Sequence, residues 1–176
     1  MSLKLYLTGF MGSGKTTIGK QLADALGLPF VDLDGRLEEK TGTSIARIFA
    51  ERGEGEFRKM EAEVLRETAN EGPAVFATGG GTPCFYNNME WMNENGITLY
   101  LEVPPAVLLE RLKNGTALRP LLKGKTDAQL LSFIENKLEE RRPFYEKANL
   151  ACRADCPLPE VIESIVPYFK RFQIRK

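Results

Sequence analysis

A run of small and polar residues near the start of the chain has the spacing of a phosphate-binding loop. Residues 9–16 read Gly-Phe-Met-Gly-Ser-Gly-Lys-Thr and fit the pattern G-x-x-x-x-G-K-[ST] between an apolar segment and a helical one. Glycines let successive backbone N–H groups surround a phosphate chain, and the following helix adds its positive end. We expect a nucleoside triphosphate here, with the Lys15 ammonium on the β- and γ-phosphates and the Thr16 hydroxyl on Mg²⁺. The residues expected to contact it are Gly12, Ser13, Gly14, Lys15, Thr16 and Thr17.

Two carboxylates follow the second apolar segment of the chain. Asp32 and Asp34 alternate on an extended stretch, so that their side chains can point in different directions, one toward a metal ion and one toward a substrate. No aspartate ends the third apolar segment, where a Walker B carboxylate would normally stand. Asp32 is therefore the expected second metal carboxylate, acting through water because Mg²⁺ keeps several waters. The alternative is a pair of solvated carboxylates, one of which caps the next helix.

Three further features have side chains or backbone groups suited to a substrate. The triple glycine, Gly79, Gly80 and Gly81, offers bare N–H groups that a ligand can approach closely. Arg58 has Glu61 three residues later on a predicted helix, which can hold its guanidinium, although an ordinary surface ion pair is the alternative. Arg119 lies in a glycine-bounded stretch and can close over phosphates like an arginine finger, unless it is simply a solvated arginine.

The elements that must position these groups alternate along the chain. Apolar strands are predicted over 3–8, 28–32, 73–78, 97–102 and 149–151. Helices are predicted over 16–25, 35–70 with breaks near 41–43 and 52–53, 87–95, 104–113, 126–147 and 157–172. This alternation is typical of an α/β fold, here a single three-layer α/β/α domain with a five-stranded parallel sheet flanked by helices. Ligands bind such sheets beyond the carboxyl ends of the strands, so the phosphate loop, the aspartates and the triple glycine should share one cleft.

The composition excludes several kinds of chemistry. The 176 residues include 24 basic and 24 acidic side chains and no histidine, which excludes histidine triads and histidine metal sites and gives no electrostatic case for nucleic-acid binding. Three cysteines without paired spacing do not suggest a zinc site. The chain begins on its first strand and has no apolar run near the length of a membrane span. We expect a cytoplasmic protein that does not bind a membrane.

Together these motifs resemble the shikimate kinase family over nearly the whole chain. In chain order, the matching stretches are the loop over 9–17, Phe30-Val31-Asp32-Leu33-Asp34, Ser44-Ile45-x-x-Ile48-Phe49, Gly53-Glu54-x-x-Phe57-Arg58-x-x-Glu61, Thr78-Gly79-Gly80-Gly81, Leu118-Arg119-Pro120-Leu121-Leu122 and Arg141-x-Pro143-x-Tyr145. The resemblance implies one P-loop kinase domain over 1–176 with the nucleoside monophosphate kinase fold. It implies a substrate-binding helical region over about 33–61 and a mobile lid over about 113–125.

The resemblance also implies a reaction and a set of roles. The γ-phosphate of ATP, with Mg²⁺, would be transferred to the 3-hydroxyl of shikimate, giving shikimate 3-phosphate and ADP on the pathway to chorismate and the aromatic amino acids. Asp34 would bind the acceptor hydroxyls and accept the proton, and Arg119 would reach the phosphates from the lid. The groups implied at the acceptor are Arg58 and Arg141 on the carboxylate, Gly79, Gly80 and Gly81 through the backbone, and Phe49 and Phe57 on the ring. The implied catalytic set is Lys15, Asp34 and Arg119.

Other interpretations compete with this one. Another small-acceptor kinase, for gluconate or a nucleoside monophosphate, shares the phosphate loop, although two phenylalanines favour a ring over an open chain. A GTP-dependent switch is suggested by Asp32-Leu33-Asp34-Gly35 and Asn136-Lys137-Leu138-Glu139, but neither stretch stands where a guanine-binding protein needs it. The match is weakest around Arg111 and 153–157, where adenine should bind, so nucleotide preference stays open. A monomer is expected.

Overall fold

The structure is a computed structural model that describes residues 3–114 and 126–173 of the chain. Its strands are β1 (Lys4–Thr8), β2 (Phe30–Asp32), β3 (Ala74–Ala77), β4 (Ile97–Glu102) and β5 (Leu150–Arg153). Its helices are α1 (Lys15–Leu26), α2 (Leu33–Thr41), α3 (Ile45–Glu67), α4 (Asn88–Asn95), α5 (Pro105–Asn114), α6 (Asp127–Tyr145) and α7 (Leu158–Gln173). Two short 3₁₀ helices are η1 (Thr68–Asn70) and η2 (Thr82–Cys84).

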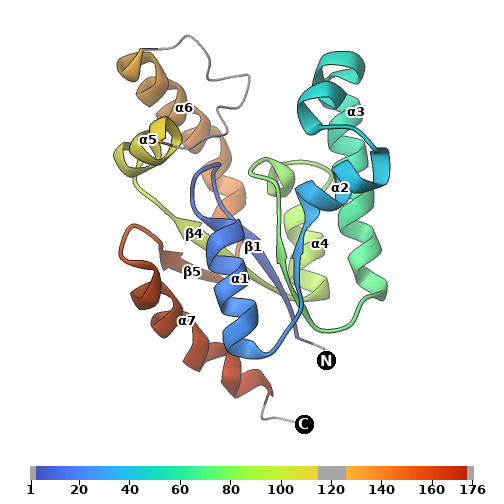
Figure 1. Ribbon diagram of the computed structural model, residues 1–176, viewed down its shortest axis with the longest axis vertical. Coiled ribbons are helices and arrows are strands. Elements are labelled where there is room, and N and C mark those ends of the chain that lie inside the picture. Colours follow the sequence, from blue (N-terminus) through green and yellow to red (C-terminus); the bar gives the residue numbers. More distant parts are fainter. Residues whose placement is uncertain (1–2, 115–125, 174–176) are drawn as a thin grey trace.

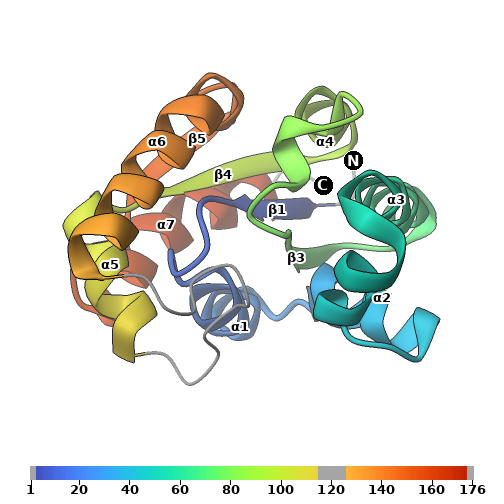
Figure 2. The ribbon, with the colours of Figure 1, turned by 90° about the horizontal axis from the view of Figure 1, so that it is seen from above.

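The five strands form one parallel sheet in the order β2-β3-β1-β4-β5. Helices α1 and α7 cover one face of the sheet, and α4 and α6 lie over the other, as Figure 2 shows. The predicted three-layer α/β/α architecture is thereby confirmed. Because β1 is central and its loop leads directly into α1, the phosphate loop stands at the middle of the sheet's carboxyl edge (Figure 1).

Alternation along the strands divides the apolar residues into two cores. Leu5 and Leu7 of β1 are fully buried in a cluster that includes side chains of α1 and α7. Tyr6, between them, points to the opposite face and packs with Phe76 and residues of α2, α3 and α4. A strand buried on both faces is what a parallel sheet covered by helices requires.

The long helical stretch after β2 is interrupted at the two predicted places. Gly42, between α2 and α3, has φ 65°, and Gly53, inside α3, has φ 79° and ψ 169°. The second conformation is accessible almost only to glycine and breaks the helix into two segments. Helix α2 begins at Leu33 and not at Gly35 as expected, because the Asp32 carboxylate caps it by accepting hydrogen bonds from the Asp34 and Gly35 N–H groups.

The other predicted elements are confirmed in type and order, with end points that shift by a few residues. Strand β5 continues to Arg153 instead of ending at 151, since its ladder with β4 extends to the pairing of Glu102 with Arg153. The predicted lid over 113–125 falls almost entirely outside the described residues. No described helix is both long enough and apolar enough to cross a membrane.

Candidate active site

The phosphate loop joins β1 to α1 and has the backbone of an anion cradle. Gly12 and Gly14 have φ values of 81° and 94°, and Gly14 stands directly before the first turn of α1. The Lys15 ammonium donates hydrogen bonds to the Gly9 and Phe10 carbonyl oxygens, at 2.8 and 3.0 Å, which draws the side chain back along the loop. The buried Ser13 hydroxyl has no partner among the described residues, so a polar atom is available where a phosphate oxygen would lie.

A hydroxyl and a carboxylate meet beside this loop. Thr16 Oγ1 donates a hydrogen bond of 2.9 Å to Asp32 Oδ2, while Asp32 Oδ1 caps α2. Oxygen ligands of this kind suit Mg²⁺, which binds few protein groups and completes its shell with water and phosphate oxygens. The described residues contain no cluster of three or more acidic, cysteine or histidine side chains that could hold a metal by themselves. The pair therefore fits a metal that arrives with phosphates.

The triple glycine packs tightly against three different neighbours. A Cβ atom on Gly79 would lie 2.8 Å from Asp34 Oδ1, and one on Gly80 would lie 3.1 Å from the backbone nitrogen of Met11 in the phosphate loop. A Cβ atom on Gly81 would lie only 2.6 Å from Nη1 of Arg58. A side chain at 79 or 81 would displace these carboxylate or guanidinium groups, and one at 80 would press on the phosphate-loop backbone. The acidic, phosphate-binding and basic parts of the site therefore converge on the triple glycine. The expectation that these groups share the carboxyl edge of the sheet is confirmed.

Arg58 and Glu61 form a buried ion pair. Their side chains are 9% and 5% exposed, and Arg58 Nη1 donates to Glu61 Oε2 at 3.2 Å. The surface ion pair considered as an alternative is wrong, since α3 turns both groups toward η2, where Thr82 Oγ1 donates to Glu61 Oε1 at 2.5 Å. Burial raises the pKa of Glu61, and the Arg58 charge acts in the opposite direction.

Glu54 and three aromatic rings complete the surroundings of Arg58. Glu54 Oε1 accepts from Nε and Nη2 of Arg58, at 3.2 and 2.9 Å. The guanidinium carbon lies near the ring centroids of Phe85, Phe57 and Phe49, at 4.5, 5.0 and 5.8 Å. Rings at these distances attract the cation and fix its plane. The Phe85 contact was not predicted, and no sequence signal could have found it, because Phe85 comes from the turn after η2.

A second arginine, Arg141 of α6, lies close to the phosphate loop. The Arg141 guanidinium carbon lies 5.5 Å from the centroid of the Phe10 ring in the phosphate loop. Burial raises the pKa of the Cys84 thiol to about 11, while the charges of both Arg141 and Arg58 oppose that rise. Helices α3 and α6, which bear these two arginines, both contact η2 and stand on either side of the phosphate loop (Figures 1 and 2). Two cations so arranged suit an anionic substrate.

Arg111, near the expected nucleotide, is held by backbone carbonyl groups. Arg111 of α5 donates to the Ala154 carbonyl at 2.7 Å and lies 3.4 Å from the Ser13 carbonyl, so it connects the phosphate loop to the segment after β5. The segment where adenine contacts were left open is thus adjacent to the phosphate site. Arg119, the expected lid arginine, lies outside the described residues.

The suggested guanine motif fails, since Asn136 and Lys137 are in the middle of α6.

Comparisons of the sequence and of the structure with known proteins point to the same family. The family model described as shikimate kinase matches residues 11–169. A shikimate kinase of Bacteroides fragilis is 48% identical over 153 residues, which cover 87% of this chain and 86% of the relative. The crystal structure of shikimate kinase from Bacteroides thetaiotaomicron superposes with a TM-score of 0.91 at 44% identity, covering 98% of this chain and 99% of the other. Shikimate kinase from Acinetobacter baumannii in complex with shikimate has a TM-score of 0.86 at 34% identity, covering 99% of this chain and 97% of the other.

Proposed function

The chain belongs to the shikimate kinase family, and we propose that it transfers the γ-phosphate of ATP to the 3-hydroxyl of shikimate, giving shikimate 3-phosphate and ADP. The observation that carries this proposal is the placement of two arginines on helices that both pack against η2: Arg58 of α3 lies against Gly81, and Arg141 of α6 lies against Phe10 of the phosphate loop. A planar guanidinium matches a carboxylate in a way that an ammonium cannot. Shikimate is a small ring with one carboxylate and several hydroxyls, which this set of groups suits.

The acceptor is proposed to bind between α3 and α6. Arg58 and Arg141 hold its carboxylate, and the backbone of Gly79, Gly80 and Gly81 approaches it closely. Asp34 lies against Gly79, on the side of this segment that faces α2, and is proposed to bind the acceptor hydroxyls. The rings of Phe49 and Phe57, with centroids 4.5 Å apart, form an apolar wall for the acceptor ring. The substrate-binding region over about 33–61 thus supplies the carboxylate, one arginine and the wall.

The nucleotide is proposed to bind at the phosphate loop. Its phosphates accept from the backbone and side chains of Gly12, Ser13, Gly14, Lys15, Thr16 and Thr17. Lys15 then exchanges its two carbonyl partners for phosphate oxygens. Mg²⁺ is proposed to bind at Thr16 and, through water, at Asp32. When bound, the metal ion neutralises charge on the β- and γ-phosphates.

Phosphoryl transfer requires positioning and charge neutralisation more than a strong base. The 3-hydroxyl oxygen forms a bond to the γ-phosphorus while the bond from that phosphorus to the bridging oxygen of ADP breaks. Asp34 orients the hydroxyl and accepts its proton. Lys15 neutralises charge on the transferred group. Arg119, which lies outside the described residues, is proposed to do so from a lid over about 113–125.

We propose one kinase domain over 1–176, acting as a monomer in the cytoplasm on a small molecule and not on a nucleic acid or a membrane.

Acceptor specificity is the direct test of this function. ADP release is measured with Mg·ATP and shikimate, beside gluconate, AMP, CMP and a sample without acceptor, and the series is repeated with GTP. We expect ADP only with shikimate, and a loss of roughly 10²–10⁴-fold in kcat in Asp34→Asn, as for other general bases. Asp24→Asn, on the exposed side of α1, is the matched control and keeps full activity. Equal turnover with no acceptor, or turnover with gluconate alone, would overturn the proposal.

A further inference from the structure

One buried hydrogen bond reaches the triple glycine from outside the groups assigned so far. The Tyr145 hydroxyl, at the end of α6, donates to the Gly80 carbonyl oxygen at 2.5 Å. Tyr145 is fully buried, and 65 residues separate the two partners in the chain. Glycines have wide conformational freedom and no side chains with which to anchor themselves. A segment made of three of them depends on such external partners for a fixed geometry.

This hydrogen bond orients the part of the segment that faces the acceptor. A peptide unit is planar, so that anchoring the Gly80 carbonyl also sets the direction of the Gly81 N–H on the same unit. Gly81 lies directly against the Arg58 guanidinium, with Nη1 only 2.6 Å from where its Cβ would be. Gly80 in turn packs on the phosphate loop at Met11. One phenol therefore holds the peptide that separates the proposed carboxylate site from the phosphate site.

Tyr145 is itself held in a fixed orientation. Its ring stacks on Tyr100 of β4, with centroids 5.0 Å apart and an interplanar angle of 18°. Burial raises the pKa of the Tyr145 hydroxyl above the ordinary value for tyrosine, so the hydroxyl is protonated near neutral pH and can donate a hydrogen bond. Arg141, one turn earlier on α6, lowers the pKa of the phenol both through its charge and through a side-chain hydrogen bond. The same face of α6 therefore bears an arginine for the substrate and the phenol that holds the glycines.

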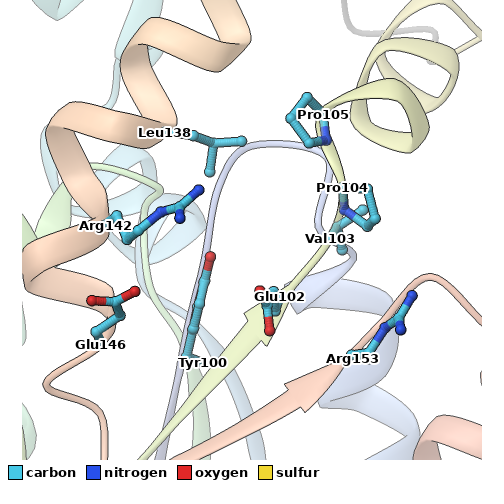
Figure 3. A pocket seen from close by; sticks show the side chains of 9 residues that line it. All are labelled: Tyr100, Glu102, Val103, Pro104, Pro105, Leu138, Arg142, Glu146 and Arg153. Atoms are coloured by element: carbon cyan, nitrogen blue, oxygen red, sulfur yellow. The ribbon is translucent and has the colours of Figure 1, made fainter.

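Among the described residues, the Tyr100 hydroxyl does not contact the triple glycine, so Tyr100 can serve as a control for Tyr145. Tyr100 lines a cavity of about 300 Å³ together with residues of α6 and of the ends of β4 and β5. Figure 3 shows its hydroxyl pointing toward Arg142 and Leu138. No hydrogen bond joins Tyr100 to the triple glycine in the described part of the chain. The two tyrosines stack on each other, but only the Tyr145 hydroxyl contacts the site.

We propose that Tyr145 is a positioning residue for the acceptor: its hydroxyl holds the Gly80–Gly81 peptide in the orientation that the substrate carboxylate requires. This inference rests on the proposed function. It assigns to α6 a second task besides presenting Arg141. Without the hydroxyl, the Gly80 carbonyl is left buried and unpaired, and the glycine segment gains alternative orientations that bind the acceptor poorly.

The test compares Tyr145→Phe with Tyr100→Phe in the full-length protein. Each change removes one phenolic oxygen from the same stacked pair and keeps the ring. For Tyr145→Phe we expect the KM for shikimate to rise about tenfold, as for loss of a buried hydrogen-bond partner, with the KM for ATP within about twofold of the parent. Tyr100→Phe should leave both KM values unchanged. The melting temperature of each variant is recorded by circular dichroism.

The possible outcomes separate the inference from the proposed function. A parent protein that releases no ADP with shikimate contradicts the proposed function. With an active parent, an unchanged KM for shikimate in Tyr145→Phe contradicts the inference alone, and so does an equal rise in both KM values. A Tyr145→Phe protein that does not fold at 25 °C also contradicts it, since the hydroxyl would then serve the fold and not the acceptor.

Discussion

At the scale of single residues, the most informative group is the buried Arg58, which donates hydrogen bonds from its guanidinium to two glutamates. Taken as a whole residue, Arg58 is 7% exposed, and arginines are almost never so buried unless they are paired. Its guanidinium donates to Glu54 on one edge and to Glu61 on another, while its flat face lies against Gly81. These partners fix the plane of the cation before any substrate arrives, and such preorganisation lowers the cost of binding.

Arg58→Lys tests whether this fixed plane matters for the acceptor. A single ammonium cannot donate to both glutamates and present two parallel N–H groups to a carboxylate. We expect the KM for shikimate to rise roughly 10–100-fold, the range for hydrogen bonds to charged groups, with the KM for ATP little changed. Arg47→Lys, in the exposed pair with Glu51 on the same helix, is the control and should behave like the parent. A normal KM in Arg58→Lys would remove the arginine from the acceptor site.

Glu61 gives a prediction about pH. Its pKa is raised in the folded protein, mainly by burial, so the carboxyl is protonated more readily in the folded protein than in the unfolded chain. The stability contributed by that protonated form is complete below the unfolded pKa of about 4.3 and is lost as the pH rises through the folded pKa. Glu61→Gln keeps a neutral side chain at every pH. Relative to the parent, its free energy of unfolding should therefore increase between pH 4.5 and neutrality, as urea titrations at several pH values can measure. A difference that decreases over this range would contradict the raised pKa.

The residues predicted from sequence are those with local signals. The phosphate loop, the aspartates after β2 and the triple glycine each stand at a strand end, where the α/β pattern itself places ligands. Phe85 and the contact between Tyr145 and Gly80 could not be predicted in this way. They depend on how η2 packs against α3 and α6, and a single sequence does not show how these elements pack.

At the scale of elements, the kink in α3 determines how the acceptor region meets the rest of the site. Gly53 separates the segment bearing Phe49 from the one bearing Phe57 and Arg58, and its φ of 79° with ψ of 169° lies in a region essentially reserved for glycine. The sequence indicated this break because glycine is a poor helix former. The sequence could not show that Phe49 and Phe57 pack together across the kink, because this contact depends on the angle between the two segments of α3.

Gly53→Ala should therefore destabilise the protein although the added methyl group has room. Apart from the adjacent backbone, no atom of the described residues lies within 4 Å of a Cβ at this position, so the cost is one of backbone conformation, about 1–3 kcal/mol. Gly55→Ala is the matched control: it also has an open environment, its φ is not positive, and alanine there should be neutral or stabilising. The free energies of unfolding of both variants check this. Equal stability would show that the kink is not under strain.

At the scale of the whole molecule, the sheet brings together groups that lie far apart in the chain. The alternation of strands and helices predicted a parallel sheet and placed the ligand at its carboxyl edge. The order β2-β3-β1-β4-β5 was not predictable from the pattern. That order places β1 at the centre, with α3 and α6 on either side of the phosphate loop (Figure 2). Each of these helices can thereby supply one arginine to the proposed acceptor site.

The most direct test of this account is the identity of the phosphorylated product. The protein is incubated with Mg·ATP and shikimate, and the mixture is followed by phosphorus and proton NMR. We predict one new phosphate ester, coupled to the proton on carbon 3 of the ring, and one ADP for each shikimate consumed. Inorganic phosphate with unchanged shikimate, or an ester at another hydroxyl, would contradict the arrangement of Asp34, the two arginines and the phosphate loop proposed here.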